Sequence, residues 1–137
     1  MAVTKVDTAE QFDAEYPRVR NWLIEALKLS DNNISERDLL IGLVERDYQL
    51  WTTENAACVT SLTEWNGKPV CCLFLIGGNK GKAMREVLCD GQDAVEAYAV
   101  SHGCDGLLGI GRKFWAKVLR PYGFITEGDC FYKGFEK

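Results

Sequence analysis

Residues 57–76 read ACVTSLTEWNGKPVCCLFLI. Within this stretch, Ala57–Trp65 is rich in β-forming residues, and Asn66-Gly67 separates it from a second apolar run at Pro69–Ile76. An Asn-Gly pair between two such runs is the strongest local signal for a β-hairpin. Because Val70–Ile76 is apolar on both faces, we expect this strand to lie in the centre of a sheet.

Two amphipathic helices are expected before the hairpin, after a short strand at Val3–Val6. Thr8-Ala-Glu-Gln11 has the form of a capping box, which begins a helix. Pro17 either kinks this helix or starts a second segment, because proline has no backbone N–H to donate. Ser35 is a favourable N-cap for the next helix, which ends near Asp47. The apolar residues at helical spacing are Phe12, Tyr16, Val19, Leu23 and Leu27 in the first helix and Leu39, Leu40, Leu43 and Val44 in the second.

The chain beyond the hairpin alternates between strands and helices. Ala83–Cys89 has a loose alternation of side chains that predicts a strand. A helix at Gln92–His102 follows, and Gly103 is expected to end it as a left-handed C′ residue. The remaining elements are a strand at Leu107–Ile110, a helix at Arg112–Arg120, and a hairpin of Phe124–Thr126 with Cys130–Phe135.

This order of elements, β-α-α-β-β-β-α-β-α-β-β, predicts a mixed α/β (α+β) protein in which helices cover a mostly antiparallel sheet. The chain has 137 residues, which suits one domain rather than two. Its apolar content of 47% is enough for one hydrophobic core and argues against disorder. We therefore expect a single domain over residues 1–137.

The net charge is −4, from 16 basic and 20 acidic residues, and the isoelectric point is near 5.0. Proteins that bind nucleic acid generally carry a basic surplus, so nucleic acid is not expected as a partner. No apolar stretch approaches the roughly 18–20 residues of a membrane span. The first residues do not resemble a secretion signal. We expect a cytoplasmic protein that does not bind a membrane.

The six cysteines are expected to be small, buried, apolar side chains in a reducing compartment. No Cys-x-x-Cys pair occurs and His102 is the only histidine, so no zinc-ligand spacing exists and no metal site is expected. Cys71 and Cys72 are adjacent on the central strand and should point to opposite faces. A nucleophilic thiol is the alternative, although only His102 is available to activate it.

The C-terminal half resembles a known family in its residues. Gly103–Phe124 reads GCDGLLGIGRKFWAKVLRPYGF, which is similar to the fifth strand, fourth helix and closing Gly-Phe of the GNAT (GCN5-related N-acetyltransferase) superfamily. Within it, the small GNAT-like proteins of tailed phages and prophages are resembled by Gly111-Arg112, Trp115, Leu119 and Tyr122-Gly123-Phe124. Gly77-Gly-Asn79 after the Asn-Gly hairpin fits that group too. The similarity in element order covers nearly the whole chain, and the similarity in residues covers Asn66–Phe124.

The resemblance implies transfer of an acetyl group from acetyl-CoA to an amine. In this family a loop after the fourth strand binds the pyrophosphate through the N–H groups of a helix N-terminus. The pantetheine enters where the fourth and fifth strands separate at a β-bulge or splay. The loop has two placements here, Gly78–Ala83 and Cys89–Asp93. We prefer the second, which makes Gly91 the phosphate-binding glycine, because the first requires one helix across Asp90-Gly91 and leaves too few strands.

The same resemblance names the candidate catalytic residues. Glu86, on the strand expected to be the fourth of the family, would be the general base, and Tyr122 would be the acid beside the thiol. The family's own tyrosine position is occupied by Leu119. Each candidate also has a structural interpretation, Glu86 as a solvated carboxylate beside Arg85 and Tyr122 as a packing residue at the end of a helix.

Gly109-Ile-Gly111-Arg112 is the best candidate for a cofactor-binding segment. Its glycines Gly109 and Gly111, at the end of a strand, allow close approach of a ligand to the backbone. Arg112 is a cation at the start of a helix, where anions are ordinarily favoured. An anionic ligand would explain it, and so would an ion pair with Asp105, Asp90 or Glu86.

Two functions follow from these observations. The first is a GNAT-shaped phage or prophage protein without catalysis, a structural, assembly or host-interaction module whose partner is a virion or host protein, in the host cytoplasm or the virion. The second is an acetyl-CoA-dependent N-acetyltransferase that acts on an unidentified amine. The sparse phosphate loop and the displaced tyrosine favour the first function, and Gly109–Arg112 keeps the second open.

Overall fold

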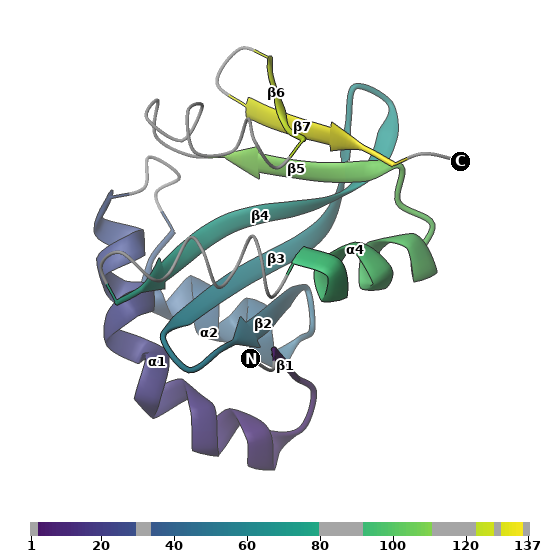
Figure 1. The fold of residues 1–137 in the computed structure, drawn as a ribbon. Helices are drawn as coiled ribbons and strands as arrows, with labels where there is room; N and C mark the ends of the chain where they lie inside the picture. Colours follow the sequence, from purple (N-terminus) through teal and green to yellow (C-terminus); the bar gives the residue numbers. More distant parts are fainter. Residues whose placement is uncertain (1–2, 30–33, 80–91, 111–122, 128–129, 136–137) are drawn as a thin grey trace.

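A seven-stranded sheet forms the centre of the protein (Figure 1). The computed structural model describes residues 3–29, 34–79, 92–110, 123–127 and 130–135. The strands are β1 (Thr4–Val6), β2 (Tyr48–Thr52), β3 (Ala56–Trp65), β4 (Lys68–Gly78), β5 (Gly106–Ile110), β6 (Ile125–Glu127) and β7 (Cys130–Gly134). The helices within these residues are α1 (Ala9–Leu29), α2 (Glu36–Val44) and α4 (Gln92–Ser101). The expected mixed α/β class is confirmed.

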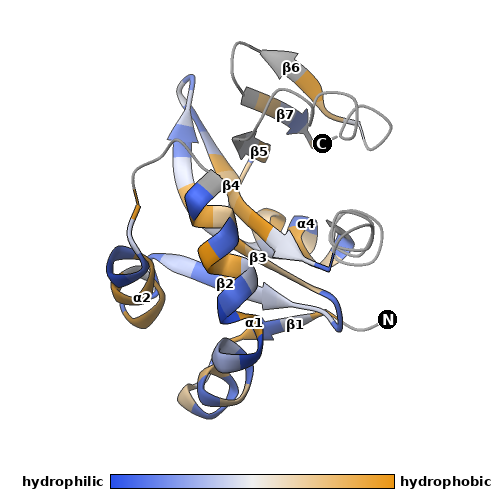
Figure 2. Ribbon diagram, turned by 90° about the vertical axis from the view of Figure 1, so that its left-hand side faces the viewer, coloured by the Kyte–Doolittle hydropathy of each residue, from blue (hydrophilic) through white to orange (hydrophobic). Residues whose placement is uncertain are grey.

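The strands follow the order β1-β2-β3-β4-β5-β7-β6 across the sheet. β4 pairs with β5 in parallel, whereas the other pairings between described strands are antiparallel. β4 therefore lies in the middle of the sheet, as its two apolar faces predict. Figure 2 shows its apolar middle in orange. The last two strands form the expected hairpin, with β7 beside β5 and β6 at the edge.

The β3–β4 hairpin closes with a two-residue turn. Trp65 pairs with Lys68, and Asn66 and Gly67 between them have φ angles of 51° and 78°. A type I′ turn requires positive φ at both central residues, and Asn-Gly adopts it most readily. The predicted hairpin is confirmed at its expected position.

Helices α1 and α2 cover one face of the sheet, and α4 covers the other (Figure 1). Each face has its own hydrophobic core. Val19 and Leu23 of α1 are fully buried in the first core, and Val95 and Ala99 of α4 are buried in the second. No helix within the described ranges is both long and apolar enough to cross a membrane.

Both predicted helix caps are present. The Thr8 hydroxyl accepts a hydrogen bond from the Gln11 N–H at 3.1 Å, and the Gln11 side chain accepts from the Thr8 N–H at 3.2 Å. Ser35 makes the equivalent reciprocal pair with Asp38 at the start of α2. Pro17 lies inside α1, which continues as one helix from Ala9 to Leu29, so the prediction of a separate second segment is wrong. Burial of the apolar face of α1 outweighs the one backbone hydrogen bond that proline omits.

Strand β2 was not predicted from the sequence. The second helix was expected to continue to about Asp47, but α2 ends at Val44 and Tyr48–Thr52 pairs with β1 on one side and β3 on the other. The predicted strand at Ala83–Cys89 and the predicted helix at Arg112–Arg120 lie outside the described residues. The strand that pairs with β5 is therefore β4, not Ala83–Cys89.

Candidate active site

Strands β4 and β5 run together for four residues and then separate. Val70 pairs with Gly106 at one end of this parallel ladder and Leu73 pairs with Gly109 at the other. Beyond Leu73, β4 continues to Gly78, whereas β5 ends at Ile110. Figure 1 shows the two strands moving apart toward their C-terminal ends. We call this place, residues 74–78 of β4 with Ile110 of β5, the β4–β5 divergence.

A β-bulge lies at the point where the strands separate. On β3, the neighbours Val59 and Thr60 pair with Leu75 and Leu73, so Phe74 of β4 is an extra residue without its own partner. A bulge bends its strand and increases the local twist. The bulge therefore turns the end of β4 away from β5. Past Phe74, the edge of β4 that faces β5 has no partner strand among the described residues.

Helix α1 lies very close to the end of β4. A Cβ atom on Gly77 would be 2.5 Å from the backbone carbonyl oxygen of Trp22 and 2.9 Å from its carbonyl carbon. No real Cβ approaches a backbone atom so closely, so glycine is required for this packing. The helix and the strand end are thereby held together on one side of the divergence.

Hydrogen bonds from α1 and β4 also hold the turn between β2 and β3. The Arg18 guanidinium donates to the carbonyl oxygens of Thr53 and Glu54, at 2.9 and 3.1 Å. Asn79, directly after β4, donates from its backbone N–H and from its side chain to Asn55, both at 2.8 Å. The open end of the sheet is therefore fixed by contacts with both α1 and this turn.

Glu15 and Arg18, two ionisable side chains of α1 near this end of the sheet, are engaged in structural contacts. The bidentate Glu15–Arg18 pair and the hydroxyl of Thr52 hold the pKa of Glu15 below its usual value, against a raising effect of partial burial. Neither β4 nor β5 contains an aspartate, a glutamate or a histidine. The divergence thus offers backbone groups and apolar side chains, but no acid or base from its own two strands.

The described thiols are unsuited to nucleophilic catalysis. Burial raises the pKa of Cys71 to about 12, and it raises the pKa values of Cys58 and Cys104 as well. The prediction that these side chains are small, buried and apolar is confirmed for Cys58, Cys71, Cys72 and Cys104, which are free thiols. Cys71 faces the α4-side core and Cys72 the α1-side core, as their adjacency predicts.

The structure places one of the predicted site residues. Gly109 is buried on β5, where it pairs with Leu73 on one side and Phe131 on the other, at the last position before the divergence. The remaining predicted site residues, Glu86, Gly91, Gly111, Arg112 and Tyr122, lie outside the described residues. The reason for choosing Glu86 does not hold, because the strand that pairs with β5 ends at Gly78. Its role as a base stays a prediction.

Comparison with known proteins identifies the arrangement. No family model and no curated protein matches the sequence. Among solved structures, Tetrahymena GCN5 has a TM-score of 0.69 at 7% identity, over 99% of this chain and 97% of that one. The NatC complex bound to Gag peptide and CoA has a TM-score of 0.67 at 9% identity, over 99% and 100%. The chain has the GNAT fold.

A third structure, a GNAT family acetyltransferase from Brucella melitensis in complex with acetyl-CoA, has a TM-score of 0.60 at 11% identity, over 99% of this chain and 90% of that one. Identities this low show the GNAT fold alone. Within that fold, this chain has both a bulge in β4 and a separation of β4 from β5. Phe74 and Gly77, which shape the divergence through the bulge and the contact with α1, were not predicted from the sequence.

Proposed function

We propose that the protein binds an acyl-CoA thioester, acetyl-CoA in the first instance, at the β4–β5 divergence and transfers the acyl group to an amine. The observation that carries this proposal is the coincidence of the Phe74 bulge with the point where β5 leaves β4. It leaves a strand edge whose backbone donors and acceptors have no partner strand among the described residues, and a pantetheine with its two amides would pair with them. Two of the GNAT structures quoted above contain CoA or acetyl-CoA.

The position of β4 changes which loop we assign to the pyrophosphate. The family's loop follows the fourth strand directly, and the chain after β4 reads Gly-Asn-Lys-Gly-Lys-Ala at positions 78–83. From the sequence alone this placement left too few strands for the fold, and strand β2 is the missing one. We therefore propose Lys80, Gly81 and Lys82, rather than Gly91, for the phosphates. Two lysines and two glycines suit an anionic ligand that is held close to the backbone.

The residues of the divergence would position the reactants rather than move protons. When bound, a thioester supplies an acyl carbon that the amine attacks, with the thiolate as leaving group. The backbone N–H groups of β4 past Phe74 would orient the acyl carbonyl and stabilise negative charge on its oxygen. Glu86 as the base and Tyr122 as the acid stay predictions from the resemblance, as do Gly109, Gly111 and Arg112 as cofactor contacts.

A second candidate function is binding without transfer. The observation that favours it is that β4 and β5 contain no aspartate, glutamate or histidine to accept the proton of the amine. In this case the protein is a GNAT-shaped module that recognises a partner, which the sequence-based prediction places in a phage virion or in the host. The phage origin and the cytoplasmic or virion location are proposals that rest on resemblance.

Titration with acetyl-CoA tests the proposal. A ligand present at 100 times its dissociation constant stabilises the folded state by about 2.7 kcal/mol, which a thermal melt detects readily. We expect a clear rise in Tm with acetyl-CoA and a smaller rise with CoA. Absence of any shift at millimolar acetyl-CoA would overturn the proposal.

Matched variants separate the two loop placements. We expect Lys80→Glu to weaken acetyl-CoA binding at least tenfold, because it places a negative charge beside the phosphates. Lys68→Glu makes the same change at the opposite end of β4 and should leave affinity unchanged, as should Gly91→Ala. A tenfold loss of acetyl-CoA affinity in Gly91→Ala, without a loss in Lys80→Glu, would instead support the placement at Cys89–Asp93.

Release of free CoA separates the two functions. The protein that binds acetyl-CoA is incubated with a panel of amines, namely a polyamine, a lysine-containing peptide and an aminoglycoside, and thiol release is followed. Release above the rate of hydrolysis supports acyl transfer. Binding without release from any amine supports the non-catalytic module.

A further inference from the structure

A cavity of about 270 Å³ lies at the β1 edge of the sheet, away from the β4–β5 divergence. It is enclosed by the end of β1, the start of α1, the end of α2 and the start of β2, with Tyr98 of α4 at its side. We call it the N-terminal cavity. Its volume is at the lower end of the range for small-molecule sites, which suits a ligand smaller than a nucleotide.

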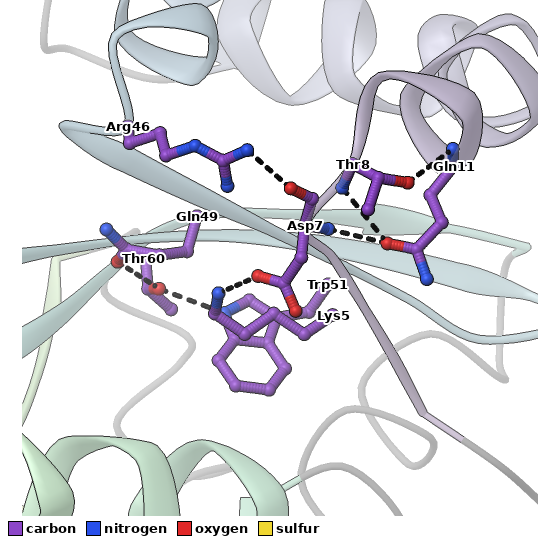
Figure 3. A network of polar contacts seen from close by, with 8 residues as sticks. All are labelled: Lys5, Asp7, Thr8, Gln11, Arg46, Gln49, Trp51 and Thr60. Carbon is purple, nitrogen blue, oxygen red and sulfur yellow. Dashed lines mark hydrogen bonds and ion pairs between the residues drawn. The ribbon is translucent and has the colours of Figure 1, made fainter.

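A buried carboxamide in the lining has a donor without a partner in the described part of the chain. Gln49 is only 8% exposed and lines the cavity. The indole N–H of Trp51 donates to the Thr60 hydroxyl at 3.0 Å, and that hydroxyl donates to the Gln49 side-chain oxygen at 2.9 Å (Figure 3). The Gln49 amide nitrogen bonds to nothing else among the described residues. Buried polar groups are nearly always paired, and an acceptor on a ligand in the cavity would complete the hydrogen bonding of this nitrogen.

Arg46 has a charge that no carboxylate of the described residues neutralises. It lies directly after the end of α2 with φ of 65°, a conformation that residues other than glycine rarely adopt. Its guanidinium donates to the backbone carbonyl oxygen of Asp7, while the Asp7 carboxylate pairs with Lys5 (Figure 3). Across the described ranges, no carboxylate lies within ion-pair distance of Arg46. The other guanidinium N–H groups are therefore available at the cavity.

The remaining lining decides the kind of ligand. The side-chain charges cancel, with Lys5 and Arg46 against Asp7 and Asp13, so a doubly charged anion is not favoured. The N-terminus of α1, capped by Thr8, adds a partial positive charge at the same place. The apolar part of the lining includes Phe12, Leu43, Val44 and Leu50. A singly charged head with an apolar body complements this lining.

We propose that the N-terminal cavity binds a small organic carboxylate with a branched aliphatic or aromatic body. The carboxylate would accept hydrogen bonds from Arg46 and from the Gln49 carboxamide, and the body would pack against the apolar lining, including Tyr98 on the same face of the sheet as Gln49. This site is independent of acetyl-CoA, because none of its residues belongs to the β4–β5 divergence.

Titrations followed by two-dimensional ¹H–¹⁵N NMR on the full chain, without acetyl-CoA, test the proposal. The probes are isovalerate and benzoate, each with its neutral amide, and inorganic phosphate as the doubly charged comparison. We expect saturable shifts of the Gln49 side-chain NH₂ and the Trp51 indole N–H with the carboxylates. The amides and phosphate should bind at least tenfold more weakly. Trp51→Phe assigns the indole signal.

Variants at exposed arginines supply the control. Arg46→Gln removes the charge while keeping a donor for the Asp7 carbonyl, and should weaken carboxylate binding at least tenfold. Arg37→Gln makes the same change in net charge at a residue of α2 that does not line the cavity, and it should leave carboxylate binding unchanged. Any of three results would overturn the proposal. These are the absence of a saturable shift at 20 mM carboxylate, equal affinity for the acid and its amide, and an equal loss of carboxylate affinity in both variants.

Discussion

Gly77→Ala is the sharpest test of the packing that shapes the β4–β5 divergence. The new methyl carbon would lie 2.5 Å from the Trp22 carbonyl oxygen, well inside contact distance. Relief requires α1 or the end of β4 to shift, and overpacking of this kind costs about 2–3 kcal/mol. For a chain of this length, that corresponds to a fall in Tm of roughly 8–12 °C. Urea unfolding followed by fluorescence measures the same loss at constant temperature.

Two further variants show that the loss comes from a backbone contact. At Gly42, an added Cβ would meet the ring of Tyr48 at 2.2 Å, so truncating that ring in Gly42→Ala/Tyr48→Ala should recover part of the cost of Gly42→Ala. At Gly77, the first contact is a carbonyl oxygen, which side-chain truncation leaves in place. Trp22→Ala should therefore give no recovery when it is combined with Gly77→Ala.

Gly67→Ala is the matched control for conformational strain. An added Cβ at Gly67 meets nothing within 4 Å, but its φ of 78° is unfavourable for alanine. We expect a cost of about 1 kcal/mol. A Gly77→Ala protein within 0.5 kcal/mol of wild type, or one restored by Trp22→Ala, would show that α1 does not press on the end of β4. It would also remove the reason to regard that end as rigid.

Three other outcomes follow from local contacts. Ser35→Ala should lower stability by about 1 kcal/mol in urea unfolding, because it removes the capping box with Asp38. The pKa of Glu15 is lowered in the folded state, so the stabilisation by its carboxylate is complete above about pH 4.5 and is lost as the pH falls further. Glu15→Gln should therefore reduce the fall of Tm at acidic pH in a profile of Tm against pH. A chromogenic disulfide reagent should react with four buried thiols only when the protein unfolds, namely Cys58, Cys71, Cys72 and Cys104. A fast reaction of any of these thiols in the native protein would contradict their burial.

Much of the fold could be predicted because its signals are local. Asn66-Gly67 specifies a type I′ turn through its own backbone preferences, and two apolar faces on β4 specify a central position. The capping boxes at Thr8 and Ser35 are likewise contained in four consecutive residues. Each of these features is decided by neighbours in sequence, so no knowledge of distant contacts was needed.

Strand β2 escaped prediction because its determinants are distant. Tyr48–Thr52 follows α2 without a glycine or proline, since the left-handed residue after the helix is Arg46. The last four residues of β2 are buried, so the strand shows no alternation between buried and exposed side chains. What makes it a strand is pairing with β3 across a short turn and with β1, whose partner residues are 44 to 48 positions away in the chain.

The candidate site was predictable only in part for a related reason. Gly109 could be named from glycine spacing and a strand end, and it does lie at the last paired position before the divergence. The bulge at Phe74 has no such signature, because only the class of bulge with a left-handed first residue requires a glycine, and Phe74 does not have a positive φ. It exists only as a mismatch of register between β3 and β4.

The missed strand had a consequence for function as well as for the fold. With β2 omitted, Ala83–Cys89 had to act as the strand beside β5, and the phosphate loop moved with it to Cys89–Asp93. Because β4 pairs with β5, our proposal puts that loop at positions 78–83, which contain two glycines and two lysines. Under this proposal the phosphate loop is not lost, and the argument from its loss for a non-catalytic module no longer applies. Comparing Lys80→Glu with Gly91→Ala therefore tests the strand assignment and the binding site together, because topological position decides which loop faces the ligand.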